Sequence, residues 1–135
     1  MASYETKTIL NCTVEKAYEL VATVEKQMDW RTDLNEIEVL TPKQFIEHTK
    51  DGYSTYYTVT KVSENQCWQR TFENENIEGF SLYTFIPKGN KTQFIMTEKA
   101  RTSKLLMKPY VRNYLKGHQY HYIHNLKEAI GQNDW

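Results

Sequence analysis

Three of the four histidines lie near the C-terminus in the stretch HQYHYIH, which runs from His118 to His124. Histidine binds metal ions and transfers protons near neutral pH, so the spacing raises the question of a metal or catalytic centre. On a helix these three positions spread over about 120° and cannot all converge on one ion. We therefore predict no metal site, with His121 and His124 facing solvent. His118 flanks the apolar stripe, where it is either structural or part of a pocket wall, and is a weak catalytic candidate.

Two charged residues lie on strand faces that otherwise carry large apolar side chains. Glu98 falls in the predicted strand 91–101 and Arg70 in the predicted strand 66–73. If both point inward they should pair, because an unpaired buried charge is very costly. Such a pair would anchor a polar head group or act in acid–base chemistry, with Glu98 as a second weak catalytic candidate. The alternative is that Glu98 ends its strand in water or that a bulge shifts the register, since a slip of one residue reverses every side chain.

Composition narrows the possible partners. The 135 residues carry 17 Lys and Arg against 17 Asp and Glu, so the formal charge is zero. A neutral chain gives no support to a nucleic-acid or anionic-membrane partner, although a local basic patch can still exist within a neutral total. The 10 tyrosines predict an interior, or a pocket, that is both aromatic and polar.

Several classes of site are not indicated. Cys12 and Cys67 are far apart and are expected to be reduced thiols. No Cys/His zinc spacing, GxGxxG, P-loop or HExxH occurs, so we expect no metal and no cofactor. The N-terminus lacks a signal-peptide pattern and no stretch reaches membrane-spanning length, so we expect a cytoplasmic protein without stable membrane insertion.

Local patterns predict the order of the elements. Thr13 is a candidate N-cap for a helix, and Asp51-Gly52 is a strong hairpin signal between two strands. Short connections between the later strands predict an antiparallel meander. The predicted strands are 4–12, 34–41, 43–50, 53–63, 66–73, 79–86 and 91–101, and the predicted helices are 14–21, 24–30 and 102–130.

The last predicted helix has an apolar stripe, a proline near its start and a polar residue within the stripe. Pro109 requires the helix to begin near it or to bend there, and Gly131 is a suitable C-cap. Gln119 lies in the middle of the stripe, where a polar group needs a partner or a water, so it is a candidate to face a cavity. The predicted stripe consists of Val111, Leu115, Gln119, Tyr122, Ile123, Leu126, Ala129 and Ile130.

Several stretches carry a resemblance to a known family. They are Thr13–Val21 (TVEKAYELV), Trp30, Glu36–Leu40 (EIEVL) and Tyr83–Thr92 (YTFIPKGNKT), followed by the long helix. Over residues 3–130 the chain resembles the START-like, or Bet v 1-like, helix-grip superfamily of the polyketide cyclase/dehydrase and lipid transport type. Asp29 departs from the family, in which many members carry proline before this tryptophan. No catalytic signature carries over residue by residue.

The resemblance implies an α+β helix-grip fold as a single domain over residues 1–135. A curved seven-stranded antiparallel sheet, with two short helices after the first strand, would wrap around the C-terminal helix and enclose a cavity. Strand alternation suggests which side chains line it, although each apolar one is equally suited to a packed core. The candidate lining residues are Trp30, Tyr57, Val59, Trp68, Arg70, Phe72, Phe85, Phe94, Met96, Glu98, Met107, Tyr110, Leu115, His118, Gln119 and Tyr122.

Three functions are consistent with these residues. The favoured one is binding or transport of a small hydrophobic or amphipathic, lipid-like molecule. The second is a cyclase or dehydratase acting on an aromatic or polyketide-like molecule, with His118, Glu98 and tyrosine hydroxyls as acid–base groups. The third is a protein-interaction or stress-linked module with a filled core. The protein is expected to be a monomer or homodimer, and the apolar segment 105–110 is either an entrance flap or a dimer contact unless it proves buried.

Overall fold

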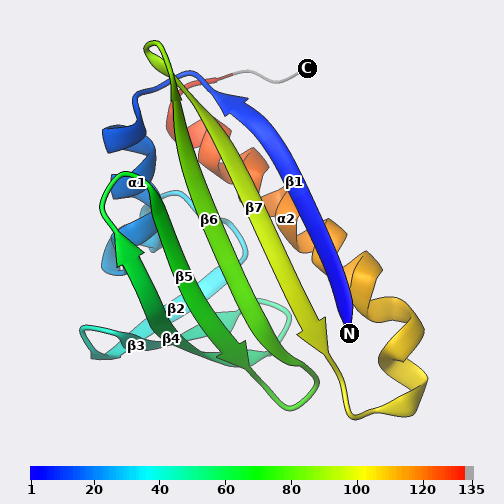
Figure 1. Ribbon diagram of the computed structural model, residues 1–135. Coiled ribbons are helices and arrows are strands. Elements are labelled where there is room, and N and C mark those ends of the chain that lie inside the picture. Colours follow the sequence, from blue (N-terminus) through cyan, green and yellow to red (C-terminus); the bar gives the residue numbers. More distant parts are fainter. Residues whose placement is uncertain (133–135) are drawn as a thin grey trace.

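The computed structural model describes residues 1–132, and it forms one curved antiparallel sheet that packs against a long helix (Figure 1). The seven strands lie in the order β1-β7-β6-β5-β4-β3-β2. Every neighbouring pair is antiparallel, because all connections except those through the helices are short turns. The strands are β1 (Ala2–Leu10), β2 (Leu34–Thr41), β3 (Gln44–Thr49), β4 (Ser54–Ser63), β5 (Cys67–Glu73), β6 (Glu78–Lys88) and β7 (Lys91–Arg101).

The helices occupy the two places that the sequence patterns indicated. Helix α1 (Val14–Ala22) is capped by Thr13, whose hydroxyl oxygen accepts a hydrogen bond from the Lys16 amide at 3.3 Å. The short 3₁₀ helix η1 (Val24–Asp29) follows it. A second 3₁₀ helix, η2 (Leu105–Tyr110), precedes the long helix α2 (Val111–Ala129). The α-helix thus begins just after Pro109, rather than at residue 102, because proline cannot donate the helical hydrogen bond.

The core lies between the concave face of the sheet and α2. The strand faces predicted to point inward are the buried ones on β4, β5 and β7, and on β6 Tyr83 and Phe85 point inward while Leu82 and Ile86 are partly exposed. The predicted stripe of α2 is buried from Val111 to Leu126, and only its last two residues reach the surface. The buried apolar side chains pack into one cluster.

Two turns depend on glycine. Gly52 has φ 94° in the β3–β4 hairpin and Gly89 has φ 64° in the β6–β7 hairpin, a region that other residues rarely adopt. The β3–β4 hairpin lies opposite the first half of α2. None of the helices among residues 1–132 is long and apolar enough to cross a membrane.

Candidate functional site

A groove runs between the first half of α2 and the β3–β4 hairpin. It consists of two hollows, of about 420 Å³ and about 290 Å³, which share Asp51, Tyr53 and Tyr114. We call the two together the α2 groove. The larger hollow is lined by Arg31, Asp33, Glu47, Thr49, Lys50, Asp51, Tyr53, Thr55, Tyr57, Asn113, Tyr114, Gly117, His118 and His121. The smaller one is lined by Asp51, Tyr53, Asn74, Asn76, Ile77, Met107, Tyr110, Val111 and Tyr114.

Below the groove is a much narrower space of about 10 Å³, enough for roughly one water molecule. Tyr57 and His118 line both this space and the larger hollow, so the narrow space forms the inner end of the groove. Glu98 and Leu115 also line it. A molecule in the groove can therefore reach Glu98 and Leu115 only with its inner tip.

A buried ionic cluster lies at the floor of the groove, where Arg31 and Glu47 line the larger hollow and Arg70 lies behind them. Arg31 donates to both carboxylate oxygens of Glu47, from Nη1 at 2.7 Å and from Nη2 at 3.2 Å. Arg70 donates from Nη1 to the same carboxylate at 3.2 Å. Arg31 also holds Asp33 through two hydrogen bonds at 2.8 and 3.2 Å, and Gln27 accepts a further one from Arg31 at 2.8 Å. We call Arg31, Glu47 and Arg70 the arginine–glutamate cluster.

The charged groups of this cluster stabilise one another in their ionised forms. Burial alone would raise the pKa of Glu47, but the two guanidinium groups outweigh burial and lower the pKa from 4.5 to about 2. Burial opposes the charge of Arg31, and Glu47 and Asp33 reverse that effect and raise its pKa. All three side chains are at least nine-tenths buried and bonded to one another, so the cluster stays charged at neutral pH.

Arg70 lies inside a cage of aromatic rings. Its guanidinium carbon is 4.0 Å from the ring centre of Tyr57 and 5.4 Å from that of Tyr83, with Trp68 and Phe45 slightly farther away. Such stacking favours a cation over an aromatic face. Among residues 1–132, Nε and Nη2 of Arg70 and the hydroxyl of Tyr83 make no hydrogen bond. Burial raises the pKa of Tyr83 to about 12, so this hydroxyl is neutral at physiological pH.

Glu98 belongs to a second network. It does not form the expected pair with Arg70. Ser81 donates to Glu98 at 2.6 Å and Gln119 donates to it at 3.2 Å. His118 Nε2 lies 3.8 Å from the same carboxylate. Both side chains do point inward, which was the condition for that pairing, but Glu47 on β3 is the partner that Arg70 reaches. The alternative that Glu98 lies in water is wrong.

Gln119 finds all its partners inside the protein. It donates to the Tyr4 carbonyl at 2.9 Å as well as to Glu98, and it accepts from the Thr6 hydroxyl at 2.7 Å. These bonds join β1, β7 and α2. The polar residue in the apolar stripe is thus explained by a buried network, which ties the helix to the sheet behind the inner end of the groove.

Comparison with solved structures identifies the fold. A START superfamily protein from Mycobacterium smegmatis superposes with a TM-score of 0.89 at 12% identity, covering 97% of this chain and 98% of that one. The Zhui aromatase/cyclase from a Streptomyces species matches with a TM-score of 0.81 at 8% identity, covering 94% and 92%. This chain has the START-like helix-grip fold. Norcoclaurine synthase from Thalictrum flavum shares the fold as well, with a TM-score of 0.77 at 5% identity over 97% and 87% of the two chains.

These identities are too low to carry a function from one helix-grip protein to another. The sequence matches no protein-family model and no curated protein. What the α2 groove does must therefore be argued from its own residues.

The structure places the predicted lining residues in three locations. Tyr57, Phe72, Glu98, Met107, Tyr110, Leu115 and His118 line the groove or its inner end. Trp30 lines a different hollow, of about 340 Å³, beside α1 and η1. The others are buried and line none of the hollows described for residues 1–132; they are Val59, Trp68, Arg70, Phe85, Phe94, Met96, Gln119 and Tyr122.

Sequence reasoning missed several residues of the groove. Arg31 and Glu47 are the most important, and Thr49, Asn113, Tyr114 and Gly117 also line it. A signal existed for Glu47, since it alternates with Phe45 on a strand whose register is fixed by the Asp51-Gly52 hairpin. Gly117 was visible as a glycine inside a long helix, which lowers helix stability and calls for a reason.

Proposed function

We propose that the α2 groove binds a small amphipathic molecule. The observation that carries the proposal is an open groove with an apolar outer wall whose floor is a buried, permanently charged cluster. Its volume is in the range of typical small-molecule sites. An aromatase/cyclase and norcoclaurine synthase share this fold, which is in keeping with a small-molecule site.

The wall and the floor suggest how the molecule lies. Ile77, Met107 and Val111 offer an apolar surface in the smaller hollow. Asn113 and His121 offer hydrogen-bonding groups in the larger hollow, near Glu47. The apolar part of the ligand would therefore lie toward η2, with its polar part toward the arginine–glutamate cluster.

Gly117 provides the test of this arrangement. A Cβ added at this position meets no heavy atom within 4 Å, and the residue lines the larger hollow. Gly117→Leu should therefore leave the fold intact and fill part of the groove, while Gly117→Ala serves as the matched control.

The probe is anilinonaphthalene sulfonate, an amphipathic dye whose fluorescence rises on binding, and freshly purified protein is also examined by native mass spectrometry. We expect saturable dye binding that is weakened about ten-fold or more in Gly117→Leu and kept in Gly117→Ala. Equal binding by the leucine variant, or no binding by the wild type together with a clean native mass, would refute the proposal.

A second candidate function rests on the contact between His118 and Glu98. A histidine whose Nε2 lies 3.8 Å from a buried carboxylate, at the inner end of a groove, is suited to proton transfer. If this site is catalytic, the protein should promote exchange of the α-protons of an aryl methyl ketone with deuterated water. His118→Gln should abolish the exchange, whereas His124→Gln, on the same helix but outside the groove lining, should keep it; no exchange by the wild type argues against catalysis.

Two features also fit the third alternative, an interaction module. The core side chains behind the groove pack into one cluster, and the segment 105–110 is exposed.

A further inference from the structure

The segment η2 presents apolar side chains to solvent at one end of the molecule. Leu105 is 75% exposed, Leu106 is 87% exposed and Tyr110 is 67% exposed, and none of the η2 residues is buried. Figure 1 shows η2 projecting beyond the ends of β1 and β7, at the start of α2. Single exposed leucines are ordinary, but two adjacent ones with a neighbouring tyrosine form an apolar tip.

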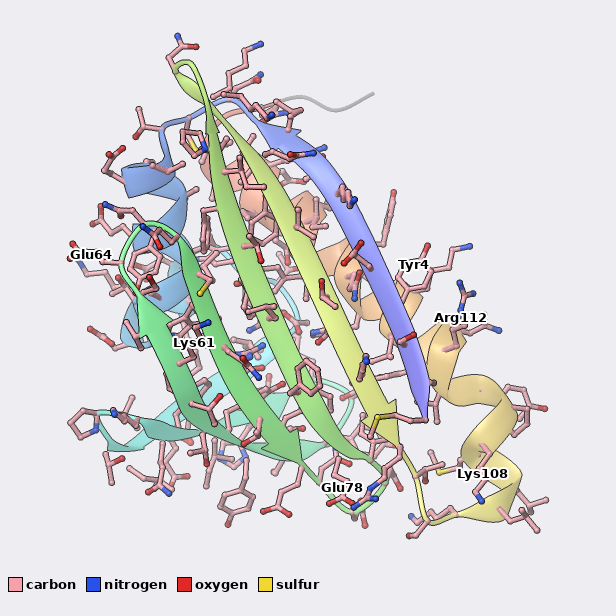
Figure 2. All side chains as sticks on the ribbon, viewed as in Figure 1. Tyr4, Lys61, Glu64, Glu78, Lys108 and Arg112 are labelled. Atoms are coloured by element: carbon pink, nitrogen blue, oxygen red, sulfur yellow. The ribbon has the colours of Figure 1, made fainter. Side chains whose placement is uncertain are left out.

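The same part of the chain is basic. No Asp or Glu occurs between Glu98 and Glu128, although the whole chain is neutral. Lys104 precedes the apolar tip, Lys108 lies within it, and Arg112 and Lys116 follow at intervals of four residues. Figure 2 shows Lys108 on η2 and Arg112 on the adjoining start of α2, and the Arg112 guanidinium lies 5.0 Å from the Tyr4 ring centre. The neutral total thus conceals a local excess of positive charge.

We propose that η2 and the first turns of α2 dock reversibly on an anionic lipid bilayer. Leu105 and Leu106 would enter the headgroup region, and Lys104, Lys108, Arg112 and Lys116 would contact lipid phosphates. An apolar tip surrounded by cations matches a surface that is apolar inside and negatively charged outside. A second copy of this chain fits less well, because pairing two such tips would bring the same cations together.

The apolar tip lies next to the opening of the groove. Met107 and Tyr110 lie in η2 and also line the smaller hollow, so the groove opens beside the docking surface. A molecule leaving the bilayer would enter the groove at its apolar end. The docking itself does not depend on the proposed ligand binding, since it requires only lipid and protein.

The test is flotation of the full chain with vesicles of phosphatidylcholine, with or without phosphatidylglycerol, at low and high salt. Leu105→Ser/Leu106→Ser removes the apolar tip, and Lys104→Gln/Lys108→Gln removes two cations. Val62 is 58% exposed on β4 and Lys61 is its exposed neighbour, so Val62→Ser and Lys61→Gln are matched controls away from η2. All these side chains are exposed, and the variants should fold normally.

We expect binding to phosphatidylglycerol vesicles that weakens with salt, and little binding to pure phosphatidylcholine. The leucine variant should bind about ten-fold or more weakly, and each cation removed should reduce partitioning about five-fold. The controls should bind like the wild type. The proposal is overturned if the wild type ignores phosphatidylglycerol, if the variants bind as the wild type does, or if the leucines instead support self-association that Leu105→Ser/Leu106→Ser abolishes.

Discussion

Glu47→Gln tests the physical account of the floor of the groove. The substitution keeps the shape of the side chain but removes the charge that neutralises two buried guanidinium groups. Glu47 is 1% exposed and Arg70 is fully buried, so water cannot replace the lost carboxylate. Only Asp33 would remain as an anionic partner, and its side chain is 39% exposed and bonds to Arg31 alone.

The magnitude follows from two separate arguments. Removing one partner of a buried ion pair typically costs about 3–5 kcal/mol. The drop of the Glu47 pKa from 4.5 to about 2 corresponds to about 3 kcal/mol of folding free energy at neutral pH. Since a domain of this size is stable by about 5–15 kcal/mol, the variant should lose a substantial part of its stability at pH 7.

The pH dependence of this loss has a definite sign. The folded-state pKa of Glu47 lies below the unfolded value, so the stabilisation is complete above about pH 4.5 and is lost as the pH falls toward 2. The difference between wild type and Glu47→Gln should therefore shrink from about 3 kcal/mol at pH 7 to about 1 kcal/mol at pH 3.

Urea denaturation followed by tryptophan fluorescence at the two pH values measures this difference. Glu75→Gln, at an exposed residue in the β5–β6 turn, is the control and should change stability by less than about 0.5 kcal/mol. The reasoning is wrong if Glu47→Gln is as stable as the wild type at pH 7, or if the difference stays constant between pH 7 and pH 3.

Three further substitutions test single features of the fold. Gly117→Ala should raise stability by about 1 kcal/mol in thermal denaturation, because glycine costs that much within a helix and a Cβ meets nothing here; a lower stability would contradict the open space at this wall. Gly79→Ala should destabilise by about 3 kcal/mol or more, since its Cβ would lie 1.9 Å from the Lys99 carbonyl oxygen on the paired strand; a neutral result in urea denaturation would exclude such close pairing. Tyr83 has its pKa raised from 10.0 to about 12, so its neutral form favours folding below pH 10 and that contribution is lost as the pH rises to 12. Tyr83→Phe should reduce this alkaline loss and stay within about 1 kcal/mol of the wild type at pH 7, because the hydroxyl makes no hydrogen bond within residues 1–132; an unchanged ultraviolet titration near pH 12 would argue against it.

The sequence patterns predicted the elements because each is set by local chemistry. The Asp51-Gly52 turn, the Thr13 cap and the alternation of β7 each depend on residues within a few positions of one another. The same alternation placed Arg70 and Glu98 on the strand faces that are buried in the structure. Their partners could not be read in this way, because a long side chain that crosses a curved interior reaches whichever strand curves toward it.

The burial of Arg31 could not be predicted from local sequence patterns. The residue lies in the irregular connection between η1 and β2, where neither helical nor strand periodicity assigns a face. Gln27 and Asp33 are nearby in sequence, but the buried carboxylate that pairs with Arg31 belongs to Glu47, 16 residues away on β3. The floor of the groove is therefore a tertiary feature, and its composition emerges only when η1 and β3 are brought together.

Two unrelated features of the α2 groove lower the stability of the folded protein. A buried ionic cluster is seldom more stable than well-packed apolar residues of similar volume, and a glycine inside a helix costs about 1 kcal/mol. The cluster has a structural explanation, since Glu47 joins β3 to β5 and to the connection between η1 and β2 through its arginine partners. Both line or support the same groove, however, and Gly117 makes no close contact that needs it to be small. Stability alone would favour a larger residue at 117 and an apolar floor, so their coincidence is best explained by a requirement to keep the groove open and its floor charged.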